Sequence, residues 1–290
     1  MSLPRSATSL ALTSPWTITL AAFWVFPVAY SLYMGFTDYR LLAHGHAWVG
    51  WDNYRELFAD PAFLSALRNT FIFVLGTIPL TTVLALGMAL LVDRPFQGRA
   101  FFRSAFFLPS ITSMVVIALI FMNLYQRGGY VGLLAELVGL PVPANGFLYD
   151  NGTALFAIMA MDVWMSVGYY MLIFLAGLQA VPHELYEAAE INGASAWRRF
   201  RSITLPLLRP VALFVIVINS IKSFQVFVEI FVMTRGKFDT MTCVYFVYEN
   251  GLTTAFRVGY ASAAAYVLLV IIALFSVAQF ALMRRRGPAW

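Results

Sequence analysis

Long apolar stretches alternate along the chain with short segments that carry nearly all of its charge. Four stretches contain no acidic or basic side chain and no histidine: residues 14–36, 69–92, 104–126 and 258–283. Two further stretches are almost as clean: residues 152–181 hold only Asp162, and residues 210–234 hold Lys222 and Glu229. A helix needs about 20 apolar residues to cross the hydrocarbon core of a bilayer. The pattern therefore predicts six transmembrane helices.

The composition supports the same class of protein. Of the 290 residues, 61% are hydrophobic and 11% are charged, whereas soluble domains have about 45–50% apolar and about 25% charged residues. Such an excess of apolar side chains excludes an ordinary soluble enzyme, and it is the opposite of the composition of disordered chains. We expect an all-α integral membrane protein, with residues 1–290 forming a single transmembrane domain.

The positions of the basic residues predict how the helices face the two sides of the membrane. One set of loops and ends contains Arg5, Arg94, Arg99, Arg103, Arg198, Arg199, Arg201, Arg209 and Arg284–Arg286, and it has a net charge of +7. The loops of the opposite side have a net charge of −1. Because cytoplasmic loops are enriched in Arg and Lys, we expect both termini and the loop 182–209 in the cytoplasm. The overall charge of +5 then reflects topology and does not indicate nucleic-acid binding.

The loop 182–209 has strong local signals for two short helices. Pro182 and Glu184 suit the first turn of a helix, where proline loses no hydrogen bond and acids meet the positive end of the dipole. Gly193 suits its end, and Ser195 suits the start of a second helix. Such a compact knob with exposed alanines fits a cleft of another protein. A loop that lies flat on lipid headgroups, with its arginines on phosphates, fits the same residues equally well.

A family resemblance enters at this loop. Glu187-Ala188-Ala189, then Gly193, then Ile203-x-Leu205-Pro206 resembles the EAA loop of ABC importer permeases at every fixed position. The segments beginning at Arg99, Leu172 and Ser223 resemble the sugar-transport branch, of the maltose, lactose and glycerol-phosphate permease type. The resemblance covers nearly the whole chain, but Arg235-Gly-Lys-Phe replaces the glycine-rich run that many members carry after the fifth span.

The resemblance implies a fold, a set of partners and a location. It implies a type I importer permease in a bacterial or archaeal plasma (inner) membrane, with its pore shared with a second permease. It also implies two ATPase subunits that hold ATP and Mg, an extracytoplasmic solute-binding protein, and no cofactor on this chain. The residues that would contact the ATPase or join the contact to the fifth span are Glu187, Ala188, Ala189, Gly193, Ile203, Leu205 and Pro206.

Charged and polar residues inside the predicted spans are candidates for a solute path. A charge at membrane depth costs roughly 2.5–3.5 kcal/mol on insertion scales, so it should face a partner or a wet cavity. On one continuous helix, residues 219, 222, 225 and 229 would share a face within about 120°. The candidate set is Asp162, Trp164, Tyr169, Tyr170, Asn219, Lys222, Gln225 and Glu229. A purely structural role, with Lys222 and Glu229 paired to Asp162 or to a partner subunit, remains open at this point.

No motif in the sequence indicates catalysis or a metal site. Gly45 and Gly50 have the spacing of a phosphate loop, but Trp51 occupies the lysine position, and His183-Glu184 lacks the second histidine of a zinc hydrolase helix. We expect no enzyme activity on this chain, and a sugar or oligosaccharide importer permease is the main hypothesis. The alternatives are an intramembrane enzyme, or a self-sufficient carrier, that uses Asp162, Lys222 and Glu229.

Overall fold

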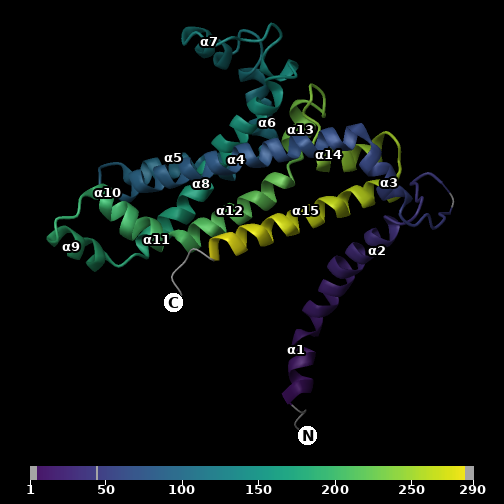
Figure 1. Cartoon of the computed structure of the whole chain (residues 1–290), viewed down its shortest axis with the longest axis horizontal. Coiled ribbons are helices and arrows are strands. Elements are labelled where there is room, and N and C mark those ends of the chain that lie inside the picture. Colours follow the sequence, from purple (N-terminus) through teal and green to yellow (C-terminus); the bar gives the residue numbers. More distant parts are fainter. Residues whose placement is uncertain (1–4, 44, 285–290) are drawn as a thin grey trace. The chain divides into compact units, whose positions relative to one another are not determined.

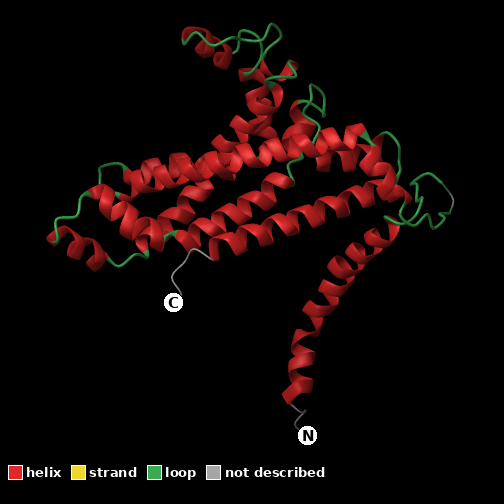
Figure 2. Cartoon of the chain, in the orientation of Figure 1, coloured by secondary structure: helices red, strands yellow, loops and turns green. Residues whose placement is uncertain are grey.

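The protein is built from helices, as Figure 2 shows. The computed structural model describes residues 5–43 and 45–284, and within these ranges the only strand-like pairing is an isolated bridge between Thr37 and Trp48. The first half of the chain contains α1 (Arg5–Leu20), a π-helical turn (Ala21–Val25), α2 (Phe26–Met34), α3 (Asp52–Ala59), α4 (Pro61–Asp93), α5 (Arg99–Ile111), α6 (Met114–Leu124) and α7 (Tyr130–Leu137). The second half contains α8 (Ala154–Gln179), α9 (His183–Ile191), α10 (Ala196–Arg199), α11 (Leu205–Leu207), α12 (Arg209–Phe224), α13 (Val228–Met233), α14 (Cys243–Tyr248) and α15 (Val258–Arg284).

The chain divides into two compact units. The first consists of residues 1–63 and 246–268, and the second of residues 64–245 and 269–290. The second unit holds the loop 182–209 and all of the polar residues singled out inside the spans. The expectation of one transmembrane domain over residues 1–290 stays a prediction.

Helix α8 forms the centre of the second unit (Figure 1). Of its most apolar 18 residues, 72% are buried. Ala85 and Ala89 of α4 are both fully buried and one turn apart, and they belong to the same core cluster as Phe174 and Tyr170 of α8. Small residues let helix backbones approach closely, which is how membrane helices gain packing contacts.

The helices confirm an all-α membrane fold with five or six spans. Five are continuous or nearly so: Leu12–Met34, Pro61–Asp93, Ala154–Gln179, Arg209–Met233 and Val258–Leu282. The sixth is the pair α5 and α6, which meet at an angle of 97°. One straight helix over residues 104–126, which the apolar pattern predicts, is therefore wrong. Thr112 adopts extended backbone angles and Ser113 leaves the helical region with ψ 127°. Hydroxyl side chains of this kind compete with helical hydrogen bonding.

The fifth span also departs from a single regular helix. Helix α12 ends at Phe224, and α13 begins at Val228. Between them the carbonyl of Val226 accepts a hydrogen bond from the Thr242 hydroxyl at 3.1 Å. A residue 16 positions away therefore satisfies a backbone group that a continuous helix would have paired internally. The helical face predicted to run from Asn219 to Glu229 is interrupted here.

The loops predicted for the same side of the membrane meet at the same end of the second unit. With its amide oxygen turned toward them, Gln179 at the end of α8 accepts hydrogen bonds from Arg99 and Arg103 at 3.1 Å each. Arg103 also donates to the carbonyl of Val92 at 3.2 Å. At the other end, the Asn69 amide donates to the carbonyl of Asp239 at 2.9 Å. Which end faces the cytoplasm stays a prediction, and Arg285 and Arg286 lie outside the described residues.

The first unit is held by an ion pair outside the spans. Arg257 donates two hydrogen bonds to the Glu56 carboxylate of α3, one of them at 2.6 Å, and its guanidinium lies 4.4 Å from the centre of the Tyr260 ring. These hydrogen bonds hold the pKa of the Glu56 carboxyl below its ordinary value. Helix α3 is thereby fixed to the start of α15.

Candidate functional site: a two-helix knob and a pocket among the spans

The segment between α8 and α12 folds as the two short helices that the sequence predicts. Helix α9 begins directly after Pro182. It ends in a Schellman motif, in which Ala194 N–H donates to the Ala189 carbonyl and Gly193 N–H donates to the Glu190 carbonyl, both at 2.9 Å. Gly193 has φ +72°, and a Cβ added there would meet no atom within 4 Å. The position therefore favours glycine, or another residue that tolerates a positive φ, because of its backbone conformation and not because of limited space.

Two contacts fix the second half of this segment against the first. The Ser195 hydroxyl accepts a hydrogen bond from Arg198 N–H at 3.4 Å and so caps α10. Arg199 pairs with Glu190 at 2.9 Å, which joins α10 to α9. The sequence predicts the cap but not the ion pair, because the pairing depends on how the two helices fold back. We call residues 183–207 the knob.

The knob is also tied to the start of the next span. The Tyr186 hydroxyl of α9 lies 2.9 Å from the Thr204 hydroxyl, which is buried. Thr204 ends a π-helical turn (Phe200–Thr204) that leads directly into α11 and α12. A displacement of α9 would therefore act on the fifth span through this turn.

The knob carries an exposed apolar surface as well as the residues of the EAA pattern. Leu185, Ile191 and Trp197 are exposed, Ile191 to 87%. Glu187, Ala188 and Gly193 are exposed, while Ala189, Ile203 and Pro206 are half-buried and Leu205 is 41% exposed. Single exposed apolar residues are ordinary, but a cluster of them on one knob is typical of a contact surface.

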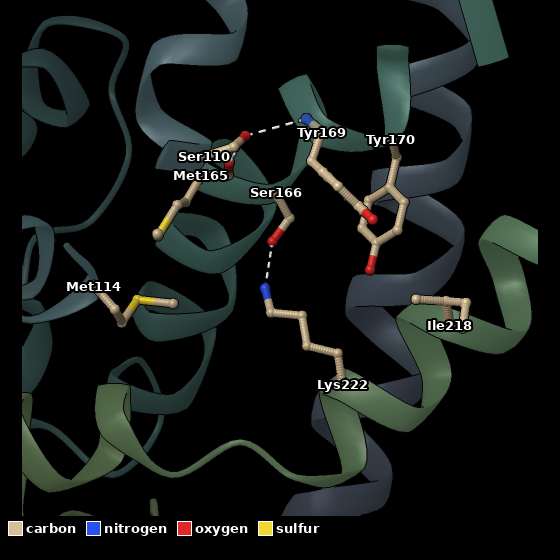
Figure 3. Close-up of a pocket in the computed structure, with 8 residues that line it drawn as sticks. All are labelled: Ser110, Met114, Met165, Ser166, Tyr169, Tyr170, Ile218 and Lys222. Carbon is tan, nitrogen blue, oxygen red and sulfur yellow. Dashed lines mark hydrogen bonds between the residues drawn. The ribbon is translucent and has the colours of Figure 1, made fainter. Parts of the chain in front are cut away.

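A pocket of about 270 Å³ lies among α5, α6, α8 and α12, all within the second unit (Figure 3). Its lining residues are Ser110, Met114, Met165, Ser166, Tyr169, Tyr170, Ile218 and Lys222. Three of the predicted path residues, Tyr169, Tyr170 and Lys222, are among them. The pocket therefore combines hydroxyl groups, aromatic rings, methionines and one ammonium group.

The ammonium group of Lys222 is paired at the edge of this pocket. Its Nζ donates to Asp162 Oδ1 at 2.7 Å and to the Ser166 hydroxyl at 2.6 Å. The Asp162 side chain is 2% exposed and the Lys222 side chain is 41% exposed. Asp162 is thus buried and outside the pocket lining, whereas Lys222 lines the pocket and is partly exposed. The pairing that the sequence left open as a structural role is present, and Lys222 lines the pocket at the same time.

Ser110 joins the bent pair α5 and α6 to the backbone of α8. Its hydroxyl donates to the Met165 carbonyl at 2.7 Å and accepts from Tyr169 N–H at 3.1 Å. These two groups are four residues apart, so they are the groups that a regular helix joins to each other. One turn of α8 is therefore bridged by a side chain from α5, at the pocket wall (Figure 3).

Close contact between α5 and α8 also depends on Gly168. A Cβ at this position would lie 1.9 Å from the carbonyl oxygen of Phe106. The absence of a side chain lets the α5 backbone approach near enough for Ser110 to reach the α8 ladder. The sequence places Gly168 inside a span without indicating which helix it meets.

The other predicted path residues lie elsewhere. Trp164 contacts the ring of Phe121 on α6 with centroids 5.3 Å apart, and Gln225 is an exposed residue in the break after α12. Asn219 is fully buried, and neither atom of its amide has a hydrogen-bond partner. Glu229 is buried on α13, where Asp162 and Lys222 act on it electrostatically.

Sequence reasoning missed five of the eight lining residues: Ser110, Met114, Met165, Ser166 and Ile218. Ser166 had a usable signal, because it lies four residues after Asp162 on the same helical face. Ser110 lies in the segment that resembles sugar permeases, but nothing in that segment indicates its contact with α8. No cluster of three His, Cys, Asp or Glu side chains that could hold a metal ion occurs in the described part of the chain.

Comparison with known proteins decides the family. Residues 81–287 match the family described as "Binding-protein-dependent transport system inner membrane component". The chain belongs to this family. The matched region includes both the knob and the pocket, and it confirms the resemblance drawn from the EAA pattern.

Two relatives and one solved structure illustrate the similarity. The probable ABC transporter permease YesP of Bacillus subtilis is 35% identical over 276 residues, covering 93% of this chain and 88% of the relative. The lactose permease LacF of Rhizobium radiobacter is 30% identical over 278 residues, covering 94% and 93%. A bacterial alginate ABC transporter, solved with an alginate pentasaccharide-bound periplasmic protein, matches with a TM-score of 0.83, 22% identity and 98% and 97% coverage.

Family membership identifies the class of activity. The chain is an inner-membrane component of a transport system and not an enzyme, and ATP hydrolysis belongs to a separate subunit. The reading as an intramembrane enzyme or a self-sufficient carrier finds no support. The Asp162–Lys222 pair is then a feature of a transport protein.

Proposed function

We propose that this chain forms one half of the pore of an ATP-driven, binding-protein-dependent importer for a sugar or oligosaccharide. The observation that carries the proposal is the family match, since it spans the knob and the pocket together. The similarity to a lactose permease supports a carbohydrate solute. The hydroxyl groups and aromatic rings of the pocket suit the hydroxyls and apolar faces of a sugar.

The knob transmits the conformational change of the ATPase subunits to the fifth span. Glu187, Ala188, Ala189 and Gly193 contact an ATPase subunit, and Ile203, Leu205 and Pro206 connect that contact to α12. The link between Tyr186 and Thr204 at 2.9 Å supports such a path. ATP and Mg bind to two ATPase subunits, and the chain itself needs no cofactor.

The remaining partners follow from the same assignment. A second permease completes the pore, and an extracytoplasmic binding protein delivers the solute. Both termini and the knob face the cytoplasm of a bacterial or archaeal cell. Tyr169, Tyr170 and Lys222 contact the solute from the pocket, while Asp162 holds Lys222 in place. Trp164, Asn219, Gln225 and Glu229 lie outside the pocket lining, and we assign them no direct contact in this state.

Uptake into proteoliposomes tests the proposed function. The chain is reconstituted with a second permease, the ATPase subunits and the binding protein of its transport system, and a panel of labelled sugars is offered. We expect uptake only when ATP is present on the side of the membrane that carries the ATPase subunits and the binding protein is present on the opposite side. Uptake by the chain alone without ATP would contradict the proposal in favour of a self-sufficient carrier.

A further inference from the structure

We propose that charge compensation of Lys222 makes the pocket select neutral, hydroxyl-rich solutes and exclude acidic sugars. The inference rests on the proposed function, because it specifies the class of carbohydrate that the same pocket accepts. Carbohydrates that cells import include both neutral sugars and sugars with carboxylates. The charges around the pocket distinguish between these two classes.

The first observation is that the cation of the pocket, the Lys222 ammonium, already has partners within the protein. Lys222 is the single charged residue among the eight that line it. Two of the three N–H groups of its ammonium donate to Asp162 and Ser166, at 2.7 Å and 2.6 Å. An acidic sugar would have to compete with Asp162 for this ammonium.

The second observation is that Asp162 has little besides Lys222 to stabilise its charge, because the Ser166 hydroxyl, which donates to its Oδ1 at 3.4 Å, is neutral. Its side chain is 2% exposed, so water does not replace Lys222 when an anion draws the ammonium away. An unpaired carboxylate in such a place carries a large desolvation cost. If an acidic sugar drew the Lys222 ammonium away, the desolvation cost of the Asp162 carboxylate would therefore no longer be compensated.

The groups that remain at the pocket are suited to an uncharged solute. Tyr169 and Tyr170 bring hydroxyls and aromatic faces, and Met114 and Met165 bring apolar surface. A neutral sugar exchanges hydrogen bonds with hydroxyls and covers apolar surface without needing a counter-ion. A sugar carboxylate that moved from water into this pocket would find no free cation. It is rejected because nothing compensates the loss of its hydration.

The local charge is measurable without knowing the solute. The single cysteine, Cys243, is replaced by alanine, and a new cysteine is placed at Ile218, which lines the pocket and is 37% exposed. The assembled complex is treated with a cationic trimethylammonium and an anionic sulfonate methanethiosulfonate. The rate with the anionic reagent is divided by the rate with the cationic reagent, and this ratio is compared with that of a free thiol in solution. The comparison reports whether the pocket admits an anion.

Three charge variants in this background give the test its direction. Asp162→Asn leaves Lys222 uncompensated, and we expect it to raise the anion-to-cation rate ratio by about tenfold or more. Lys222→Met should lower the ratio, and the double variant should return it to the starting value. Asp52→Asn removes an exposed carboxylate on α3, outside the pocket lining, and should leave the ratio unchanged.

The outcomes separate the charge proposal from the proposed function. A ratio in the unaltered pocket at or below that of the free thiol, with the expected changes in the variants, supports the exclusion of anions. A ratio that favours the anion before any substitution, or that Asp162→Asn does not move, would overturn it. Failure of both reagents to reach the cysteine would instead overturn the place of the pocket on a solute path.

Discussion

The knob and the pocket are both polar features of one apolar chain, but they arise in different ways. The knob is specified by residues close in sequence: Pro182 before the helix, Gly193 at φ +72° after it, and Ser195 as the next cap. The pocket is specified by residues far apart, since Ser110, Ser166 and Lys222 come from three different helices.

The difference shows for which polar residues the hydrogen-bond partner can be predicted from the sequence alone. Caps and glycine stops act within a few residues, so their partners are known before the fold is known. An ion pair across 60 positions, such as that between Asp162 and Lys222, depends on which helices become neighbours. Substitutions in the pocket should accordingly act on packing between helices, and those in the knob on local conformation.

The largest effect on stability is expected for Lys222→Met, which leaves the buried Asp162 carboxyl without its partner. We expect a loss of about 2–3 kcal/mol, less than the 3–5 kcal/mol of a fully buried pair, because Lys222 is 41% exposed and the Ser166 hydroxyl still donates to Asp162 at 3.4 Å. Thermal unfolding of the detergent-solubilised complex measures it. Recovery of most of the loss in the Asp162→Asn, Lys222→Met double variant would confirm the pairing, and an additive loss would count against it.

Gly193→Val should come next, because a β-branched residue strongly disfavours the left-handed conformation that ends α9. Strain of about 1–2 kcal/mol shifts the equilibrium between the folded knob and its distorted forms by about tenfold. ATP-driven uptake should fall by up to a comparable factor, while the amount of assembled complex stays normal. Gly193→Asn is the matched control, since asparagine tolerates φ > 0. Equal uptake by the two variants would show that the conformation of Gly193 does not matter.

Ser110→Ala removes both hydrogen bonds from α5 to the α8 backbone. With the net value of a buried hydrogen bond near 1 kcal/mol, we expect a loss of about 1–2 kcal/mol together with a changed pocket. Thr112→Ala serves as control, because the Thr112 hydroxyl donates only to the Leu108 carbonyl of its own helix, at 2.9 Å. If both variants unfold at the same temperature, the bridge contributes nothing.

Ser195→Ala should have the smallest effect. The loss of the cap on α10 costs about 0.5–1 kcal/mol, and the Glu190–Arg199 pair at 2.9 Å still holds the second helix. Limited proteolysis of the knob measures the local change. A drop in global stability as large as that of Lys222→Met would contradict the distinction between the two regions.

The parts that could be predicted from the sequence follow from this distinction. The apolar pattern predicts the membrane class, and local signals predict the start and end of α9. The bend of 97° between α5 and α6 could not be predicted, because residues 104–126 are as apolar as a straight span. The break after Phe224 was missed for a similar reason: the Thr242 hydroxyl that satisfies Val226 lies in a later loop.

The pocket was only partly predictable. The rule that charges inside a span should find a partner selected Asp162 and Lys222, which are paired in the structure at 2.7 Å. Ser110 and Ile218 are ordinary residues of apolar helices, and their role depends on the approach that Gly168 allows between α5 and α8. The assumption of one continuous helix placed Gln225 on the same face as Lys222, and the end of α12 removes it from that face.

Chemical crosslinking tests the central claim, that the knob meets an ATPase subunit while the pocket meets the solute. In the Cys243→Ala background, a cysteine at the exposed Ala188 or at Ile218 carries a short photoreactive group in the assembled complex. We expect the group at residue 188 to capture the ATPase subunit in an ATP-dependent yield, and the group at residue 218 to capture none. An ATPase adduct from residue 218, or none from residue 188 in a complex that hydrolyses ATP, would contradict the account.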